Sequence, residues 1–352
     1  MKTVAVLSLQ PDMILAEDVL GKNQEIIVKK EQQVNDVIMQ KLKRHNIVCV
    51  NIHEPVDYAD THYESIVLSD AFKKFSAIYT ENLQQYKKLM DKLVNEGIEP
   101  GEETLFSLHQ NICKAAPNKD MLHDYLYNRM AGEDDLTYAH CLNSALLASI
   151  FADWLGLSDE QTHILIGCAF FYDIGKLLLP HDLIWKPDKL TDEEYEQIKT
   201  HTVRGFHLLK SVHMPQEVLI TTVTHQERCD GTGYPLHLRT DKIDLYSRYI
   251  AIIDVYEALI SPRTYRSMMN TFQTIETFEK IGMQKFDSNA LRVILSHVAN
   301  NYVGQKVRLS NGTIGTVEHI NNSRLSKPVI REEDGNLLDL RAFPELEIDA
   351  IL

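Results

Sequence analysis

The residues of this chain that can do chemistry are histidines and aspartates in short stretches between positions 140 and 254. Imidazole and carboxylate groups bind divalent metal ions and transfer protons. The most distinctive stretch reads HQERCDGTGYP from His225 to Pro235. Its glycines permit positive φ and close backbone approach, so it predicts a tight loop directly after a histidine. Taken singly, most of the 15 histidines are better explained as surface or hydrogen-bonded residues.

The stretch His225–Pro235 resembles the HHERWDGTGYP signature of HD-GYP proteins, bacterial phosphodiesterases that open cyclic di-GMP. Four other stretches resemble further segments of that family, in the family's order. They are DLTYAHCLN (Asp135–Asn143), YDIGK (Tyr172–Lys176), KTH (Lys199–His201) and IDVYEAL (Ile253–Leu259). The resemblance implies two divalent metals that share one aspartate and one water. The implied ligands that this chain retains are His140, Asp173, His201, His225 and Asp254.

Two implied ligand positions hold other residues, Tyr172 in the HD motif and Gln226 in the HH pair. A phenol has a pKa near ~10 and seldom coordinates a metal, and its ring reaches farther than imidazole. A carboxamide offers only a neutral oxygen, which suits hard ions weakly. By resemblance, position 172 belongs to the metal of His140, Asp173 and Asp254, and position 226 to the metal of Asp173, His201 and His225. Each metal therefore loses one imidazole. We therefore expect reduced or absent occupancy by Fe or Mn, with Mg as an alternative. In the opposing interpretation, water fills both gaps and a weakened metal site persists.

The resemblance also implies cations that face the phosphates of the ligand. Lys176 matches the lysine of the family's HDIGK segment, and Arg263 and Arg266 match the arginines of its SDRPYR segment. Arginine suits this role because its planar group binds phosphate oxygens in pairs. A surface salt bridge is the alternative for each cation. The implied GYP loop comprises Asp230, Gly231, Gly233, Tyr234 and Pro235. Tyr234 is expected either to stack on a guanine or to brace the loop.

The asymmetry between two replaced ligands and a retained loop with phosphate cations favours binding without turnover. We expect a degenerate HD-GYP protein that binds a cyclic dinucleotide such as cyclic di-GMP, or a protein partner, with weak or no hydrolysis. The alternative is an active metal-dependent phosphodiesterase that yields the linear dinucleotide or GMP. A hydrolase of other nucleotides and a structural HDOD-like module are further alternatives, and the GYP loop and the ligand series disfavour them.

The elements that must position these residues are mostly helices. Short β-like runs around one helical pattern predict a small α/β module over residues 1–55. An apolar stripe with helical spacing predicts a helical connecting segment over 60–134. Capping boxes at Ser158 and Thr191 and the apolar run Ile164–Phe171 predict an HD-type bundle, the HD-GYP domain, over 135–301. The pair Asn311-Gly312 predicts a hairpin in a β-rich appendage over 302–352. The expected fold is mainly α.

Composition limits the partners and the compartment. The formal charge of −14 disfavours binding of a nucleic acid polymer, which depends on clustered lysine and arginine. No stretch approaches the length of a membrane span, and the first residues lack a signal peptide's apolar run. The 5 cysteines show no C-x-x-C spacing, which indicates reduced thiols and a cytoplasmic protein. A homodimer is compatible with the sequence.

Overall fold

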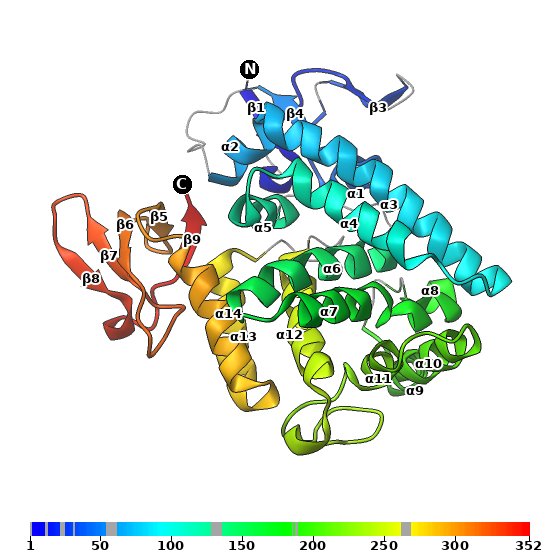
Figure 1. Ribbon diagram of the computed structural model, residues 1–352. Helices are drawn as coiled ribbons and strands as arrows, with labels where there is room; N and C mark the ends of the chain where they lie inside the picture. The colour runs from blue at the N-terminus through cyan, green and yellow to red at the C-terminus, as the bar shows by residue number, and fades with distance from the viewer. Residues whose placement is uncertain are drawn as a thin grey trace.

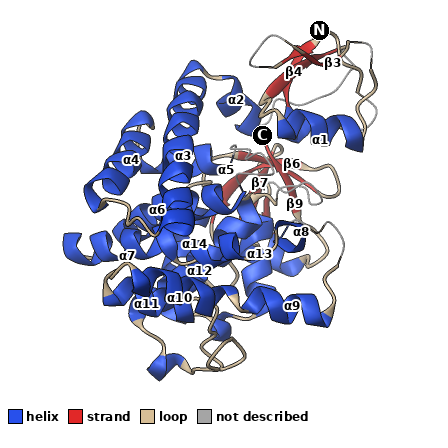
Figure 2. Ribbon diagram, turned by 90° about the vertical axis from the view of Figure 1, so that its right-hand side faces the viewer, coloured by secondary structure: helices blue, strands red, loops and turns tan. Residues whose placement is uncertain are grey.

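The computed structural model describes residues 2–10, 13–21, 25–30, 32–53, 62–127, 136–184, 186, 189–261 and 269–352 (Figure 1). Helices dominate, and the strands lie towards the two ends of the described chain (Figure 2). The prediction of a mainly α fold with small β structures at both ends is confirmed. Within the described ranges, no helix is both long and apolar enough to cross a membrane.

The N-terminal module, predicted for residues 1–55, has its own core and lies above the helices in Figure 1. Its strands form two antiparallel pairs, β1 (Lys2–Ala5) with β4 (Cys49–Ile52) and β2 (Val19–Leu20) with β3 (Ile26–Val28). Helix α1 (Asp36–Arg44) packs into this module with Ile38 and Leu42 buried. The core of the module consists of Val4, Val6, Leu9, Met13, Leu15, Val19, Ile27, Val28, Val34, Ile38, Leu42, Val50 and Ile52.

The helical bundle occupies the middle of the chain (Figure 1). Its helices are α2 (His62–Leu68), α3 (Asp70–Glu96), α4 (Glu102–Ala115), α5 (Lys119–Tyr127), α6 (Leu136–Trp154), α7 (Asp159–Phe171), α8 (His181–Ile184), α9 (Asp192–Lys199), α10 (His201–Ser211), α11 (Gln216–Thr224), α12 (Leu245–Ile260), α13 (Thr271–Ile281) and α14 (Ser288–Asn300). Helices α6, α7 and α12 contact one another and are apolar on most faces, as expected for helices at the centre of a bundle.

Local signals explain several helix ends. Both predicted capping boxes are present, because Ser158 and Thr191 accept hydrogen bonds from backbone N–H groups at the starts of α7 and α9. Helix α3 ends at Gly97, whose φ of 67° is left-handed. A third capping box at Asn270, which begins α13, was not predicted from the sequence. These caps fix where α7, α9 and α13 begin and where α3 ends, and α7 leads to Asp173 of the candidate site.

The C-terminal sheet is antiparallel, with strand order β8-β7-β6-β5-β9. Its strands are β5 (Lys306–Leu309), β6 (Ile314–His319), β7 (Val329–Glu332), β8 (Leu337–Asp339) and β9 (Ile348–Ile351). The predicted hairpin at Asn311-Gly312 joins β5 to β6, and Gly312 has a φ of 87°. Buried side chains of this sheet belong to the same apolar cluster as those of the bundle. The predicted domain limits themselves stay a prediction.

Candidate metal site

The five retained ligand residues come together from different parts of the bundle. Helix α6 carries His140, Asp173 follows α7, His201 begins α10, His225 follows α11, and α12 carries Asp254. They form two overlapping groups that share Asp173, with ligand atoms within 4.8 Å of one another in each group. We name Asp173, His201 and His225 the lower triad, and His140, Asp173 and Asp254 the upper triad. The structure thus brings together the residues that the five motifs predicted as ligands.

Gly175 sets the distance between Asp173 and His201. It lies in the 3-10 helix Ile174–Leu178, which packs against α10. A Cβ atom at Gly175 would lie 1.9 Å from the backbone oxygen of His201 and 2.8 Å from the backbone nitrogen of Gly205. Only glycine permits this approach, so the IGK stretch after Asp173 has a packing role.

The lower triad presents free lone pairs at its centre. The Nδ1 atoms of its histidines face backbone carbonyls, that of His201 at 2.7 Å from Ile198 and that of His225 at 3.1 Å from Thr222. A carbonyl only accepts, so each Nδ1 carries the proton and each neutral imidazole presents a lone pair at Nε2. These two Nε2 atoms are 3.3 Å apart and lie 3.2 and 3.5 Å from Oδ1 of Asp173.

The chemistry of the lower triad fits a divalent cation. All three side chains are fully buried, and burial lowers the pKa of His225, which keeps that imidazole neutral. Oδ1 of Asp173, which faces both histidines, accepts no hydrogen bond of good geometry from a described residue. Two imidazole nitrogens and one carboxylate, each histidine oriented by a carbonyl, are a common donor set for Fe²⁺, Mn²⁺ or Zn²⁺. The ion would neutralise lone pairs that otherwise repel one another.

The upper triad is instead filled by the phenol of Tyr172. Its hydroxyl lies 2.7 Å from Nε2 of His140, 2.9 Å from Oγ of Ser144 and 3.5 Å from Oδ1 of Asp254. Burial, Asp254 and Asp173 raise the pKa of Tyr172 well above its ordinary value, so the phenol keeps its proton. A protonated phenol donates a hydrogen bond and is a poor metal ligand. The residues of the upper triad therefore do not fit a second ion.

Gln226 takes part in the same closed network. Its side-chain nitrogen donates to Oδ2 of Asp254 at 3.0 Å, and Arg228 donates to its side-chain oxygen at 3.4 Å. The amide orientation follows from these two partners, because only the nitrogen can donate to the carboxylate. Gln226 therefore contacts Asp254 of the upper triad, although the resemblance assigned its position to the metal of the lower triad.

His140 is held between two carboxylates of α12. Its Nε2 lies 3.0 Å from Asp254, and its Nδ1 is hydrogen-bonded to Glu257. Burial alone would lower the pKa of His140, but Glu257 and Asp254 raise it to about 9. The side-chain nitrogen of Asn143 donates to Glu257 at 2.8 Å, and Tyr79 donates to Asn143 at 2.6 Å. Glu257 was not predicted as a site residue, although it lies three residues after Asp254 on the same helical face.

The GYP loop folds back on the residues that precede it. A Cβ atom at Gly233 would lie 2.3 Å from the backbone nitrogen of Arg228 and 2.4 Å from Cα of Glu227. The buried carboxylate of Glu227 accepts the backbone N–H groups of Leu236 at 2.6 Å and Leu238 at 2.9 Å. Asp230 accepts two hydrogen bonds from Thr232, which closes the turn that contains Gly231. This loop is therefore fixed by close contact with the backbone of Glu227 and Arg228 and by the hydrogen bonds of the Glu227 carboxylate.

Tyr234 lies beside the lower triad. Its ring is edge-on to that of His201 at 6.3 Å between centroids, and the Lys199 ammonium lies 5.6 Å from its centroid. The peptide bond between Tyr234 and Pro235 is cis. Burial raises the pKa of this phenol. The loop thus places an aromatic ring next to His201, where stacking on a base and bracing of the loop both remain predictions.

The predicted phosphate cations are only partly described. Lys176 makes an ion pair with Oδ2 of Asp173, and its side chain is 24% exposed. Lys176 holds the pKa of the buried Asp173 well below its ordinary value, although burial acts in the opposite sense. Arg263 and Arg266 lie outside the described residues. Lys176 is therefore the one described cation of the three, and it contacts the shared aspartate.

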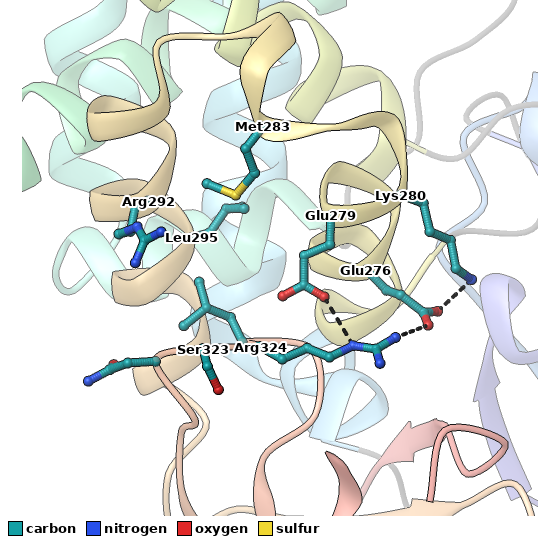
Figure 3. Close-up of a pocket in the computed structure, with 10 residues that line it drawn as sticks. Glu276, Glu279, Lys280, Met283, Arg292, Leu295, Ser323 and Arg324 are labelled. Carbon is teal, nitrogen blue, oxygen red and sulfur yellow. Dashed lines mark ion pairs between the residues drawn. The ribbon is translucent and has the colours of Figure 1, made fainter. Parts of the chain in front are cut away.

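A separate cavity of about 370 Å³ lies between α13, α14 and the segment before β7 (Figure 3). Arg324 lies 3.8 Å from both Glu276 and Glu279, and Lys280 lies 3.0 Å from Glu276. Ser326 donates to Glu279 at 2.5 Å. The charged groups of Glu276, Glu279, Lys280 and Arg324 thus pair with one another. We therefore interpret this cavity as part of the junction between the bundle and the C-terminal sheet.

The family model described as "HD domain" matches residues 120–290, a range that contains all five ligand residues. This segment is thus similar to HD domains. This match agrees with the helical fold of the segment and with its resemblance to HD-GYP proteins.

Several curated relatives of this chain are named as phosphodiesterases of cyclic dinucleotides. The cyclic di-GMP phosphodiesterase PdeB of Borreliella burgdorferi is 28% identical over 202 residues, which are 57% of this chain and 53% of the relative. A cyclic di-GMP phosphodiesterase of Pseudomonas aeruginosa is 30% identical over 204 residues, covering 58% and 49%. The 3′3′-cGAMP-specific phosphodiesterase 1 of Vibrio cholerae is 33% identical over 176 residues, covering 50% and 41%. The chain thus spans about half the length of these relatives.

Among solved structures, an HDG"Y"P protein from Bdellovibrio bacteriovorus matches with a TM-score of 0.47 and 17% identity, over 84% of this chain and 99% of the other. The resemblance to the HD-GYP family predicted from the sequence is confirmed by the HD domain and the cyclic di-GMP relatives.

Proposed function

We propose that this chain binds a cyclic dinucleotide such as cyclic di-GMP and signals with weak or no hydrolysis. The observation that carries the proposal is the buried, protonated phenol of Tyr172, which lies 2.7 Å from His140 where the family resemblance implies a metal ligand. Two-metal catalysis needs ions on both sides of the shared aspartate to stabilise the attacking and leaving oxygens. A phenol in this place removes one of these ions.

The parts of the site that would hold the nucleotide are retained beside the altered metal ligands. Tyr234 is partly exposed on a loop fixed by Glu227, and Lys176 supplies a cation at the shared Asp173. An aromatic face stacks on a base, and cations bind phosphate oxygens. The cyclic dinucleotide relatives support this ligand class. A signalling output through a protein partner or a homodimer is part of the same proposal, as is a cytoplasmic location.

Calorimetry with cyclic di-GMP tests the binding part, with chelator and with Mn²⁺. We expect saturable binding that Arg263→Ala and Arg266→Ala weaken, because each removes a charge-assisted phosphate contact worth roughly 1.5–3 kcal/mol. Arg292→Ala is the matched control, since Arg292 is an exposed arginine that lines the separate cavity. No heat of binding in either condition would contradict the nucleotide version.

A working phosphodiesterase is the second candidate, and the lower triad favours it. Three protein ligands with an open position are typical of catalytic metal sites, and a bound metal can supply a hydroxide at neutral pH. Turnover is measured by chromatography of the linear dinucleotide and GMP after incubation with Fe²⁺ or Mn²⁺. Sustained multiple turnover would establish this candidate, and absence of product with intact nucleotide binding would support the first.

A further inference from the structure

The two triads differ in whether donors of the protein already form hydrogen bonds or ion pairs with their ligand atoms. In the lower triad, the protons of His201 and His225 point outward to backbone carbonyls, and the inner lone pairs converge on Oδ1 of Asp173. The inner atoms face one another at 3.2 to 3.5 Å as acceptors. Buried acceptors that face one another are unfavourable without a shared cation or proton.

In the upper triad, every carboxylate oxygen that could bind a metal already faces a donor of the protein. Oδ2 of Asp173 is paired with the ammonium of Lys176. Oδ1 of Asp254 lies 3.0 Å from Nε2 of His140, and Oδ2 accepts from the amide of Gln226 at 3.0 Å. A second ion would have to displace these hydrogen bonds and the phenol of Tyr172 together.

We propose that this chain holds one divalent transition-metal ion, bound by Asp173, His201 and His225. The second position of the family's metal pair is replaced by a hydrogen-bonded network around Tyr172 and Gln226. Two imidazoles favour Fe²⁺, Mn²⁺ or Zn²⁺ over Mg²⁺, which prefers oxygen ligands. This inference deepens the proposed function, because it concerns the metal content of the same site. It rests on that proposal only in assuming that the site resembles the metal site of HD-GYP proteins.

The test counts metal ions in the full chain without nucleotide. The protein is stripped with a chelator, reloaded separately with Mn²⁺, Fe²⁺ or Zn²⁺, freed of excess ion and analysed by mass spectrometry for metal per chain. We expect about one ion per chain, bound through the three-ligand set. His201→Ala should lose it and His140→Ala should keep it. Each of these matched variants removes one largely buried imidazole, and circular dichroism verifies that both are folded.

Two further measurements keep the test independent of folding. The electron paramagnetic resonance spectrum of the Mn²⁺-loaded wild type should show an isolated ion without exchange coupling. An anomalous difference map of Mn²⁺-loaded crystals should show one peak between His201 and His225. Two ions per chain, no ion, or a peak at His140 would each overturn the inference. Nucleotide binding is measured separately, so the proposed function and this inference can fail independently.

The restoring variant gives the complementary result. Tyr172→His combined with Gln226→His should raise the content to about two ions per chain, because the double change removes the phenol and the amide donor. The Mn²⁺ spectrum of this variant should then show exchange coupling. A content that stays at one ion would contradict the assignment of Tyr172 and Gln226 as the groups that close the second position.

Discussion

Replacement of Tyr172 by phenylalanine tests whether its hydroxyl holds the upper triad together. The side chain is fully buried, and its hydroxyl lies 2.7 Å from His140 and 2.9 Å from Ser144. Tyr172→Phe keeps the ring and leaves two buried polar groups each without one partner. An unsatisfied buried group costs about 1–3 kcal/mol, so we expect unfolding free energy to fall by about 2–4 kcal/mol.

The assay is equilibrium unfolding in urea with chelator present, so that metal binding does not contribute to stability. Tyr195→Phe is the matched control, because Tyr195 is 47% exposed and loses the same hydroxyl at the surface. Its unfolding free energy should change by less than about 0.5 kcal/mol. If Tyr172→Phe is no more destabilising than this control, the hydroxyl does not hold the network and the reasoning is refuted.

Three further perturbations follow from the packing and charges described above. Gly175→Ala should destabilise the protein by more than about 2 kcal/mol and reduce metal binding, because its Cβ would meet the backbone of His201 at 1.9 Å; its control, Gly167→Ala, has no atom within 4 Å and should be neutral or stabilising by up to about 1 kcal/mol. Equal effects of the two changes in chemical denaturation would contradict this. Glu227→Gln should cost about 1–3 kcal/mol and speed amide exchange at Leu236 and Leu238, since one oxygen that accepts a backbone N–H is replaced by a donor; unchanged exchange there would disprove the role of Glu227. Burial would raise the pKa of Asp124, but His123 and His62 lower it from 3.8 to about 2. Its contribution of about 2 kcal/mol is present above pH 3.8 and lost as the pH falls towards 2, so Asp124→Asn should flatten the acid limb of a stability–pH curve, and an unaltered limb would argue against it.

Much of the fold was predictable because its signals are local. The capping boxes at Ser158 and Thr191 and the turn at Gly312 each depend on a few neighbouring residues, and the structure confirms them. The prediction of a buried apolar stripe along α3 was also mostly right. Phe72 and Phe75 are buried, but Ile78 is 37% exposed. Periodicity gives the face of a helix, whereas the edge of that face depends on what packs against it.

The residues predicted as ligands from motif order do come together in space, but their hydrogen bonds could not be predicted. The contact of His140 with Glu257 requires α6 to lie against α12, which no local pattern specifies. The turn of the Gln226 amide towards Asp254 depends in the same way on tertiary packing. A search for acidic residues one helical turn from a candidate ligand would have identified Glu257.

The two ends of the chain are attached to the bundle in different ways. Asn270 donates from the start of α13 to the carbonyls of Ile348 at 2.8 Å and Asp349 at 3.3 Å, and the sheet's apolar side chains complete the bundle's core. The N-terminal strands close around apolar side chains of their own. A chimaera that exchanges the N-terminal module for another domain should leave the scaffold of the candidate metal site intact. Removal of β9 should instead destabilise α13 and expose apolar surface that promotes aggregation.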